Sequence, residues 1–213
     1  REGWEHIWLP YAQMQTIITP NPVVGAEGCR IKLADGREVV DGISSWWSTC
    51  HGYQHPHIVK AIQEQAGKLS HVMFAGFAHE PAYTLSKRLC ATVGMGMERA
   101  FFTESGSVSV EVALKMAIQY WRNIGDTKRT KFICFNHSYH GDTQGAMSVS
   151  AKSHWNAAYD TLSLRNYTID IPHDEYSFAE FTDTIAAIRG TVAALIIEPL
   201  VQGAGGRSEE HTS

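Results

Sequence analysis

The sequence lacks any uninterrupted apolar run long enough to cross a bilayer, and its first residues do not follow the order of a secretory leader. It also has little excess charge of either sign. The formal net charge of -4 gives no reason to expect nucleic acid or an anionic membrane surface as a partner. These absences favour a soluble, cytoplasmic protein that binds neither nucleic acid nor membrane.

Cysteine is scarce, and the motifs of metal binding are missing. The four cysteines are scattered without a C-x-x-C pair, which is typical of reduced, buried thiols in a cytosolic protein. His51, His55 and His57 lie close together, but His55 and His57 flank a proline, and no second cluster of metal ligands is evident. The sequence also lacks H-E-x-x-H, so we expect no metal site.

Two catalytic motifs are absent as well. No G-x-S-x-G segment is present, which argues against a hydrolase with a nucleophile elbow. No G-x-G-x-x-G segment directly follows an expected strand, which argues against a nucleotide-dependent oxidoreductase.

What the sequence does contain is an alternation of strand and helix patterns. The 213 residues suffice for a sizeable core, and the alternating runs around Asp35-Gly36 predict a hairpin. Helices are expected at 55–69, 80–93, 107–121, 141–150 and 178–188, strands at 100–102, 131–135 and 192–199, and mostly loops at 155–180. This order predicts an α/β fold with a mostly parallel sheet covered by helices on both faces.

The segment "FFTESGSVSVEVALKMAIQYW" joins an expected strand to an expected helix through Ser105-Gly106-Ser107. The small side chains of this turn leave the backbone accessible. Because the first N–H groups of a helix are unpaired and carry partial positive charge, such a turn can bind a phosphate. The alternative is that Ser107 is only the N-cap of the helix.

Two further segments follow expected strands, "NHSYHGDT" and "EPLVQGAGG". Ligands of open α/β sheets bind at the carboxyl ends of the strands, so these segments and Ser105-Gly106-Ser107 are expected to meet. Tyr139 could stack on a flat cofactor. The alternative is a turn in which Gly141 supplies backbone freedom and Asp142 caps the next helix.

The segment Ser44-Ser45-Trp46-Trp47 follows the expected hairpin. If it is extended, neighbouring side chains face opposite ways, so only one of the two indoles can line a pocket and the other packs beneath it.

Taken together, "IWLPY", "DGISSWW", "HGYQHP", "SHVMFAGFAHEPA", "ESGSVSVEVALKMAIQYW", "SYHGDTQGAMSVS" and "IIEPLVQGAGG" resemble the class III pyridoxal-phosphate aminotransferases. The resemblance runs from about residue 4 to residue 206. It implies a fold-type-I transferase that binds pyridoxal 5′-phosphate and works as a homodimer with its active sites at the subunit interface. Residues 1–52 would belong to a small domain and 53–206 to the N-terminal half of the large cofactor-binding domain.

The resemblance also implies roles for single residues. Gly106 and Ser107 would bind the cofactor phosphate, Tyr139 would stack on its pyridine ring and border the substrate, and Glu198 would support the site. Trp46 would line the substrate pocket and Tyr11 would help to recognise the substrate.

The W-x-P-Y and S-S-W-W segments resemble members of the family that transfer the amino group of S-adenosylmethionine to 8-amino-7-oxononanoate, a step of biotin biosynthesis. Leu9 departs from this pattern, because such members carry histidine before the Pro-Tyr pair. The alternatives are a class III aminotransferase of ω-amino acids or ornithine, and a non-catalytic domain of the same fold.

The resemblance places the catalytic lysine of the family beyond Gly206, so this chain as given is expected to have no transaminase activity. Residues 207–213, "RSEEHTS", resemble the translation of a sequencing adapter and are expected to be a non-native tail.

Overall fold

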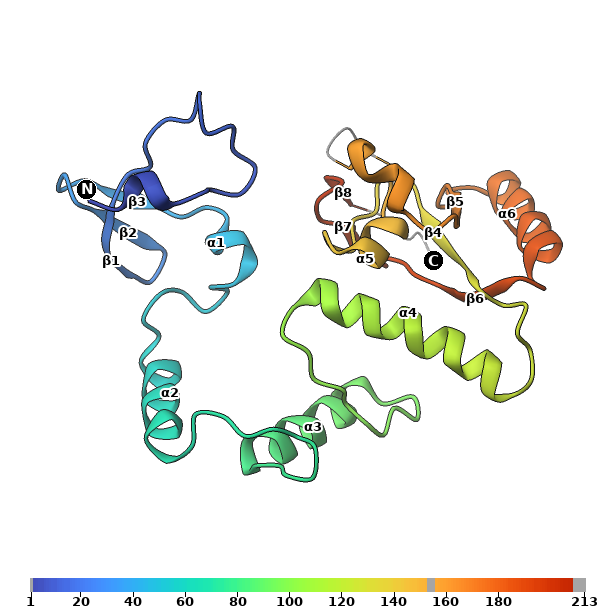
Figure 1. Ribbon diagram of the computed structural model, residues 1–213, viewed down its shortest axis with the longest axis horizontal. Helices are drawn as coiled ribbons and strands as arrows, with labels where there is room; N and C mark the ends of the chain where they lie inside the picture. The colour runs from blue at the N-terminus through green and yellow to red at the C-terminus, as the bar shows by residue number, and fades with distance from the viewer. Residues whose placement is uncertain (1, 153–155, 209–213) are drawn as a thin grey trace. The chain divides into compact units, whose positions relative to one another are not determined.

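The computed structural model describes residues 2–152 and 156–208 and divides the chain into two compact units. The first unit spans Arg1–Ala91 and the second Thr92–Ser213 (Figure 1). Among the described residues, no helix is both long and apolar enough to span a membrane. The domain boundaries expected after residues 52 and 206 stay predictions, because compactness alone does not test them.

The first unit is built on a three-stranded antiparallel sheet in the order β1-β2-β3. The expected hairpin is confirmed: Asp35 Oδ1 accepts the N–H of Arg37 at 3.0 Å, and Gly36 has a φ of 89°. The helices expected at 55–69 and 80–93 are also confirmed. The elements are η1 (Trp4–His6), β1 (Val23–Glu27), β2 (Arg30–Leu33), β3 (Glu38–Val40), α1 (Ser44–Trp47), α2 (Pro56–Lys68) and α3 (Glu80–Val93).

The second unit contains the expected parallel sheet, with the strand order β5-β4-β6. The strand β5 lies inside the segment that was expected to be mostly loop. The sequence does not predict it, because three residues are too few to show a periodic pattern. The elements are α4 (Gly106–Asn123), β4 (Lys131–Phe135), α5 (Gln144–Ser148), η2 (Ala157–Leu162), β5 (Tyr167–Ile169), α6 (Glu175–Ile188), β6 (Val192–Leu195), β7 (Val201–Gln202) and β8 (Arg207–Ser208).

The central strand β4 is buried on both faces. Phe132 and Cys134 pack with Leu114 of α4 and with Val149 in the core cluster. Phe135 alternates to the other face, where its ring stacks on Phe181 of α6 at a centroid distance of 6.3 Å. Figure 1 shows α4 and α6 beside the sheet. Helices therefore cover both faces, as the near-continuous apolar pattern of β4 predicted.

The expected strand at 100–102 is not formed among the described residues. A strand needs a partner for its N–H and C=O groups, and none of the described strands pairs with residues 100–102. Phe101 is 68% exposed. The prediction of a buried strand from this aromatic run is therefore wrong.

The expectation of buried thiols is correct for Cys134 alone. All four cysteines are free, as predicted, but Cys29 and Cys50 are exposed and Cys90 is half-buried. Burial raises the pKa of the Cys134 thiol, and a hydrogen bond with Thr168 partly opposes that shift. Cys134 therefore behaves as an apolar core residue.

Candidate active site

The first turn of α4 presents backbone donors. Ser105 is the N-cap: its Oγ accepts the N–H of Val108 at 3.2 Å, and the helix begins at Gly106. The interpretation of Ser107 as the N-cap is therefore wrong. The N–H groups of Gly106 and Ser107 have no hydrogen-bond acceptor in the part of the chain that the structure describes. A Cβ on Gly106 would meet no atom within 4 Å. This turn is open to an anion.

The loop after β4 packs directly on this turn. The N–H of Asp142 donates to Ser107 Oγ at 3.2 Å, and Thr143 Oγ1 donates to the carbonyl of Ser107 at 3.5 Å. Gly141 has a φ of +127°, and a Cβ there would lie 2.1 Å from Ser107 Oγ. Because the Ser107 oxygen only accepts in this contact, its own proton stays available to a ligand.

Tyr139 is hydrogen-bonded through both its backbone and its side chain. Its backbone N–H donates to Glu198 Oε1 at 2.9 Å, and its hydroxyl donates to Asp142 Oδ2 at the same distance. Asp142 therefore does not cap α5, whose N-cap is Thr143, and that interpretation is wrong. Tyr139 remains 41% exposed, so the anchored ring has surface left for a ligand.

Glu198 joins the second and third candidate segments. Besides the N–H of Tyr139, its carboxylate accepts the N–H of Gly203 at 3.0 Å through Oε2. Gln202 adds a second link, since its Nε2 donates to the carbonyl of Asn136 at 3.0 Å. The three segments do meet, as the sequence predicted, although only two of them follow described strands, β4 and β6, and Ser105-Gly106-Ser107 follows none.

His140 lies in the same loop with an unpaired ring nitrogen. Its Nε2 is buried and has no hydrogen-bond partner among the described residues. Burial lowers the pKa of His140, and the nearby Glu198 carboxylate partly opposes this shift. The imidazole is therefore neutral at neutral pH.

One contact beneath the site had no clear sequence signal. Glu111 of α4 accepts the N–H of Gly145 at 2.6 Å, and a Cβ on Gly145 would lie 2.3 Å from its Oε2. Glu111 thereby ties α5 to α4 behind Ser107. A single glycine in a short helical segment does not identify the residue that packs against it, so the sequence could not predict this pair.

In the first unit, Tyr11 and Trp46 contact each other. Their ring centroids are 5.7 Å apart and their planes make an angle of 78°. Trp46 and Trp47 are 60% and 67% exposed, so neither indole packs beneath the other as the extended interpretation required. That interpretation is wrong, because Ser44–Trp47 forms a turn with positive φ at every residue.

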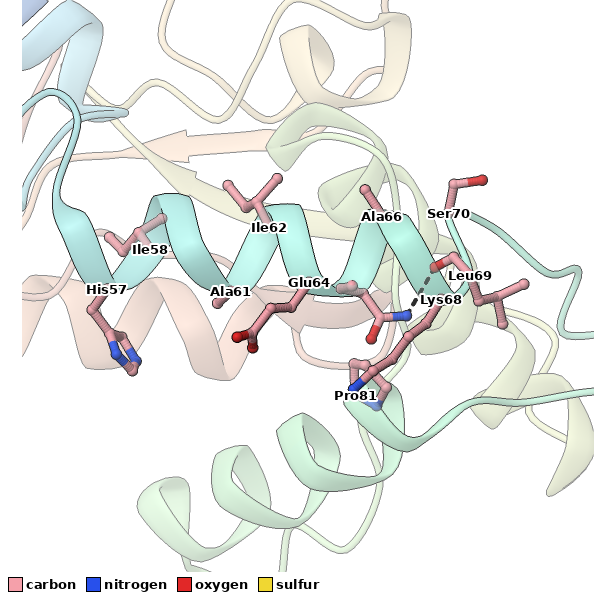
Figure 2. Close-up of a pocket in the computed structure, with 11 residues that line it drawn as sticks. His57, Ile58, Ala61, Ile62, Glu64, Ala66, Lys68, Leu69, Ser70 and Pro81 are labelled. Atoms are coloured by element: carbon pink, nitrogen blue, oxygen red, sulfur yellow. Dashed lines mark hydrogen bonds between the residues drawn. The ribbon is translucent and has the colours of Figure 1, made fainter.

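A separate hollow of about 650 Å³ lies along α2 and reaches Pro81. In Figure 2, His57 and Glu64 project from the side of α2 opposite to Ile62, and a dashed line marks the bond from Gln65 Nε2 to the Leu69 carbonyl at 2.8 Å. None of the site residues expected from the sequence lines this hollow. Within the described residues, no group of three His, Cys, Asp or Glu side chains is placed to hold a metal ion.

Comparison with known proteins shows the family to which the chain is similar. The family model described as aminotransferase class III matches residues 11–212. The adenosylmethionine-8-amino-7-oxononanoate aminotransferase of Synechococcus elongatus is 47% identical over 210 residues, which cover 94% of this chain and 49% of that protein. The protein of the same name from Mycobacterium leprae is 39% identical, covering 94% of this chain and 48% of its own.

Solved structures show the same fold. The adenosylmethionine-8-amino-7-oxononanoate aminotransferase of Methanocaldococcus jannaschii has a TM-score of 0.90 at 32% identity, covering 96% of this chain and 47% of that chain. An ω-transaminase of Thermomicrobium roseum has a TM-score of 0.85 at 27% identity, with coverage of 96% and 49%. The chain thus spans about half the length of the relatives it matches.

Proposed function

The chain belongs to the class III aminotransferases, and from that membership we propose that a protein containing it, at the length of its relatives, transfers an amino group from S-adenosylmethionine to 8-amino-7-oxononanoate. That protein is called the full-length protein below. The observation that carries the proposal is the 47% identity with the Synechococcus elongatus relative, together with the cradle at Gly106 and Ser107.

The residues of the cradle fit pyridoxal 5′-phosphate. The open N–H groups of Gly106 and Ser107 and the Ser107 hydroxyl would hold its phosphate, because a helix start favours a dianion. The ring of Tyr139, anchored through Asp142, would face the pyridine ring. Glu198 keeps the Tyr139 loop in place. The bound cofactor supplies the electron sink, and the protein supplies orientation and electrostatics.

Trp46 and Tyr11 would form the wall that receives the aliphatic chain of the acceptor, and Tyr139 would border the same substrate. An apolar indole suits a long methylene chain, since each buried methylene contributes roughly 0.8 kcal/mol. The two edge-to-face rings in the first unit support this role. The active form would be a cytoplasmic homodimer, and residues 1–52 and 53–206 would belong to its small and large domains.

Donor choice tests the proposed reaction. We expect the purified full-length protein to form 7,8-diaminononanoate from 8-amino-7-oxononanoate when S-adenosylmethionine is the donor. Product formation with ornithine or an ω-amino acid, but none with S-adenosylmethionine, would favour the rival activity. Failure with every donor would favour a non-catalytic domain.

A second test addresses the phosphate site. Ser107→Ala in the full-length protein removes a donor to the phosphate and the acceptor of the Asp142 N–H. Because hydrogen bonds to charged groups contribute about 1.5–3 kcal/mol, we expect the dissociation constant of the cofactor to rise about tenfold or more. Fluorescence titration of the cofactor-free protein measures it. Ser109→Ala is the matched control, since the Ser109 hydroxyl bonds the Ser105 carbonyl instead. Equal affinities in the two variants would contradict the assignment.

The chain as given is expected to have no transaminase activity. Among its described lysines, Lys131 begins β4 and so lies at the strand end opposite to Tyr139, and Lys152 pairs with Asp160 at 2.8 Å. Incubation with pyridoxal phosphate followed by borohydride and peptide mapping checks this expectation. Stoichiometric labelling of a single lysine together with turnover would overturn it.

A further inference from the structure

The segment Ser44–Trp47 has an unusual backbone. All four residues have positive φ, at 49°, 47°, 52° and 66°. Only glycine adopts this left-handed region readily, because a Cβ crowds the following carbonyl oxygen. A run of four such residues without a glycine does not persist on local preference, so contacts from outside the turn must hold it.

Those contacts converge on the carboxylate of Asp41. Its Oδ1 accepts the N–H of Ile43 at 3.1 Å, and its Oδ2 accepts the N–H of Ser45 at 2.7 Å. The Tyr53 hydroxyl donates to the same Oδ2 at 2.6 Å and also touches the Ser45 hydroxyl. The hydrogen bond from Tyr53 is the main cause that lowers the pKa of Asp41, so the group is ionised when it binds these donors.

Asp41 and Tyr53 are themselves hydrogen-bonded to the turn between β1 and β2. The N–H of Asp41 donates to the Cys29 carbonyl at 2.8 Å. Tyr53 and Gly28 exchange two backbone hydrogen bonds, at 2.7 and 3.0 Å. A Cβ at Gly52, beside Tyr53, would lie 3.0 Å from the Gly28 carbonyl oxygen, so the two segments are in close contact. Asp41 and Tyr53 therefore bind Ser44–Trp47 while their own backbones are hydrogen-bonded to the β1–β2 turn.

The turn determines where the indole of Trp46 points. Trp46 is its third residue, and its ring makes an edge-to-face contact with the ring of Tyr11, with centroids 5.7 Å apart. An extended backbone would turn successive side chains to opposite faces, so releasing the turn would move the indole away from Tyr11.

We propose that Asp41 is a positioning residue for acceptor binding: it holds the left-handed turn that keeps Trp46 against Tyr11, without touching the substrate itself. The inference rests on the proposed function, in which these two rings receive an aliphatic acceptor chain. The sequence marks Tyr11 and Trp46 through their resemblance to the family, whereas Asp41 and Tyr53 emerge only from their hydrogen bonds.

The test compares two variants of the full-length protein with a matched control. Asp41→Asn keeps the shape but replaces one accepting oxygen with a donor, and Tyr53→Phe removes only the phenolic donor. We expect KM for 8-amino-7-oxononanoate to rise about tenfold in Asp41→Asn with kcat nearly unchanged, as for lost uniform binding, and to rise less in Tyr53→Phe. Asp35→Asn removes a carboxylate that also accepts a backbone N–H in the first unit, and it should leave KM unchanged.

A spectroscopic measurement separates this inference from the proposed reaction. The near-ultraviolet circular dichroism of Trp46 is the difference between spectra recorded with and without the Trp46→Phe substitution in the same protein. This difference should largely disappear in Asp41→Asn and persist in Asp35→Asn. An unchanged Trp46 signal in Asp41→Asn would overturn the inference, and so would a changed signal with an unchanged KM. Absence of product in the parent protein would refute the proposed function alone, because the dichroism comparison requires no turnover.

Discussion

The substitution Gly141→Ala is expected to weaken cofactor binding strongly in the full-length protein. The new Cβ would lie 2.1 Å from Ser107 Oγ, 2.7 Å from Ser107 Cβ and 2.9 Å from Ser107 Cα. Of these three atoms of Ser107, Cβ and Cα keep their positions when the side chain rotates. The φ of +127° adds backbone strain of about 1–3 kcal/mol for a residue with a side chain. Either the loop or the first turn of α4 must move.

Both movements separate Ser107 from Tyr139, so the phosphate and ring contacts can no longer be made together. We expect the dissociation constant of pyridoxal phosphate to rise by about a hundredfold for a loss near 3 kcal/mol, with a lower melting temperature. Titration of the cofactor-free protein and thermal unfolding measure the two effects. Parent-like affinity in Gly141→Ala would show that the loop and helix are not jointly required.

Gly67→Ala is the matched control for that substitution. Gly67 lies in α2, where an added Cβ would meet no atom within 4 Å and the backbone is helical. Alanine should stabilise the protein by about 0.4–1 kcal/mol, because it restricts the unfolded chain. Cofactor affinity should stay at the parent value, so the same chemical change gives opposite results at the two positions.

The sequence alone does not distinguish these two glycines, although it predicts several other features of the fold. Strong periodic patterns predicted α2, α3, α4 and β4, because their apolar residues recur at regular spacing along the chain itself. The sequence also predicts the meeting of Ser107, Tyr139 and Glu198. The reason holds for Tyr139 and Glu198, which follow the parallel strands β4 and β6, but not for Ser107, which follows no described strand. Both predictions depend on patterns that can be read from the sequence of each segment by itself.

The failures concern side-chain hydrogen bonds, whether the two partners are close in sequence or far apart. No local pattern shows that Asp41 will accept from Tyr53 twelve residues later, so the sequence predicts an extended segment where the structure has the turn at Ser44–Trp47. Likewise, Asp142 has the residue type of a helix cap but instead binds the Tyr139 hydroxyl. Side-chain acceptors near a turn have several donors within reach, and only the folded chain selects one.

Glutamine at position 198 is expected to loosen the site and to change the titration of His140. The Glu198 carboxylate accepts one N–H through each oxygen, from Tyr139 at 2.9 Å and from Gly203 at 3.0 Å. An amide has only one oxygen, so its NH₂ group must oppose one of these donors. Leaving that donor unsatisfied costs about 1–3 kcal/mol, which we expect as a loss of unfolding free energy in urea denaturation.

The charge of Glu198 has a separate signature. Burial lowers the pKa of His140, and the carboxylate is the cause that opposes this shift. Removing the negative charge should therefore lower the pKa of His140 further below its ordinary value, which NMR titration of the imidazole in the full-length protein can follow. A pKa that rises in Glu198→Gln would contradict the contact between the two groups.

Glu64→Gln provides the matched control for both effects. Glu64 lies on the exposed surface of α2 and pairs with Lys60 at 3.8 Å, a type of ion pair that contributes little to stability. It should leave the unfolding free energy and the His140 titration at their parent values. If Glu64→Gln and Glu198→Gln lowered stability equally, the loss at position 198 would reflect the general effect of removing a carboxylate. If only Glu198→Gln loses stability, the loss comes from the hydrogen bonds of the two backbone donors. These bonds connect the Tyr139 loop to the glycine-rich turn.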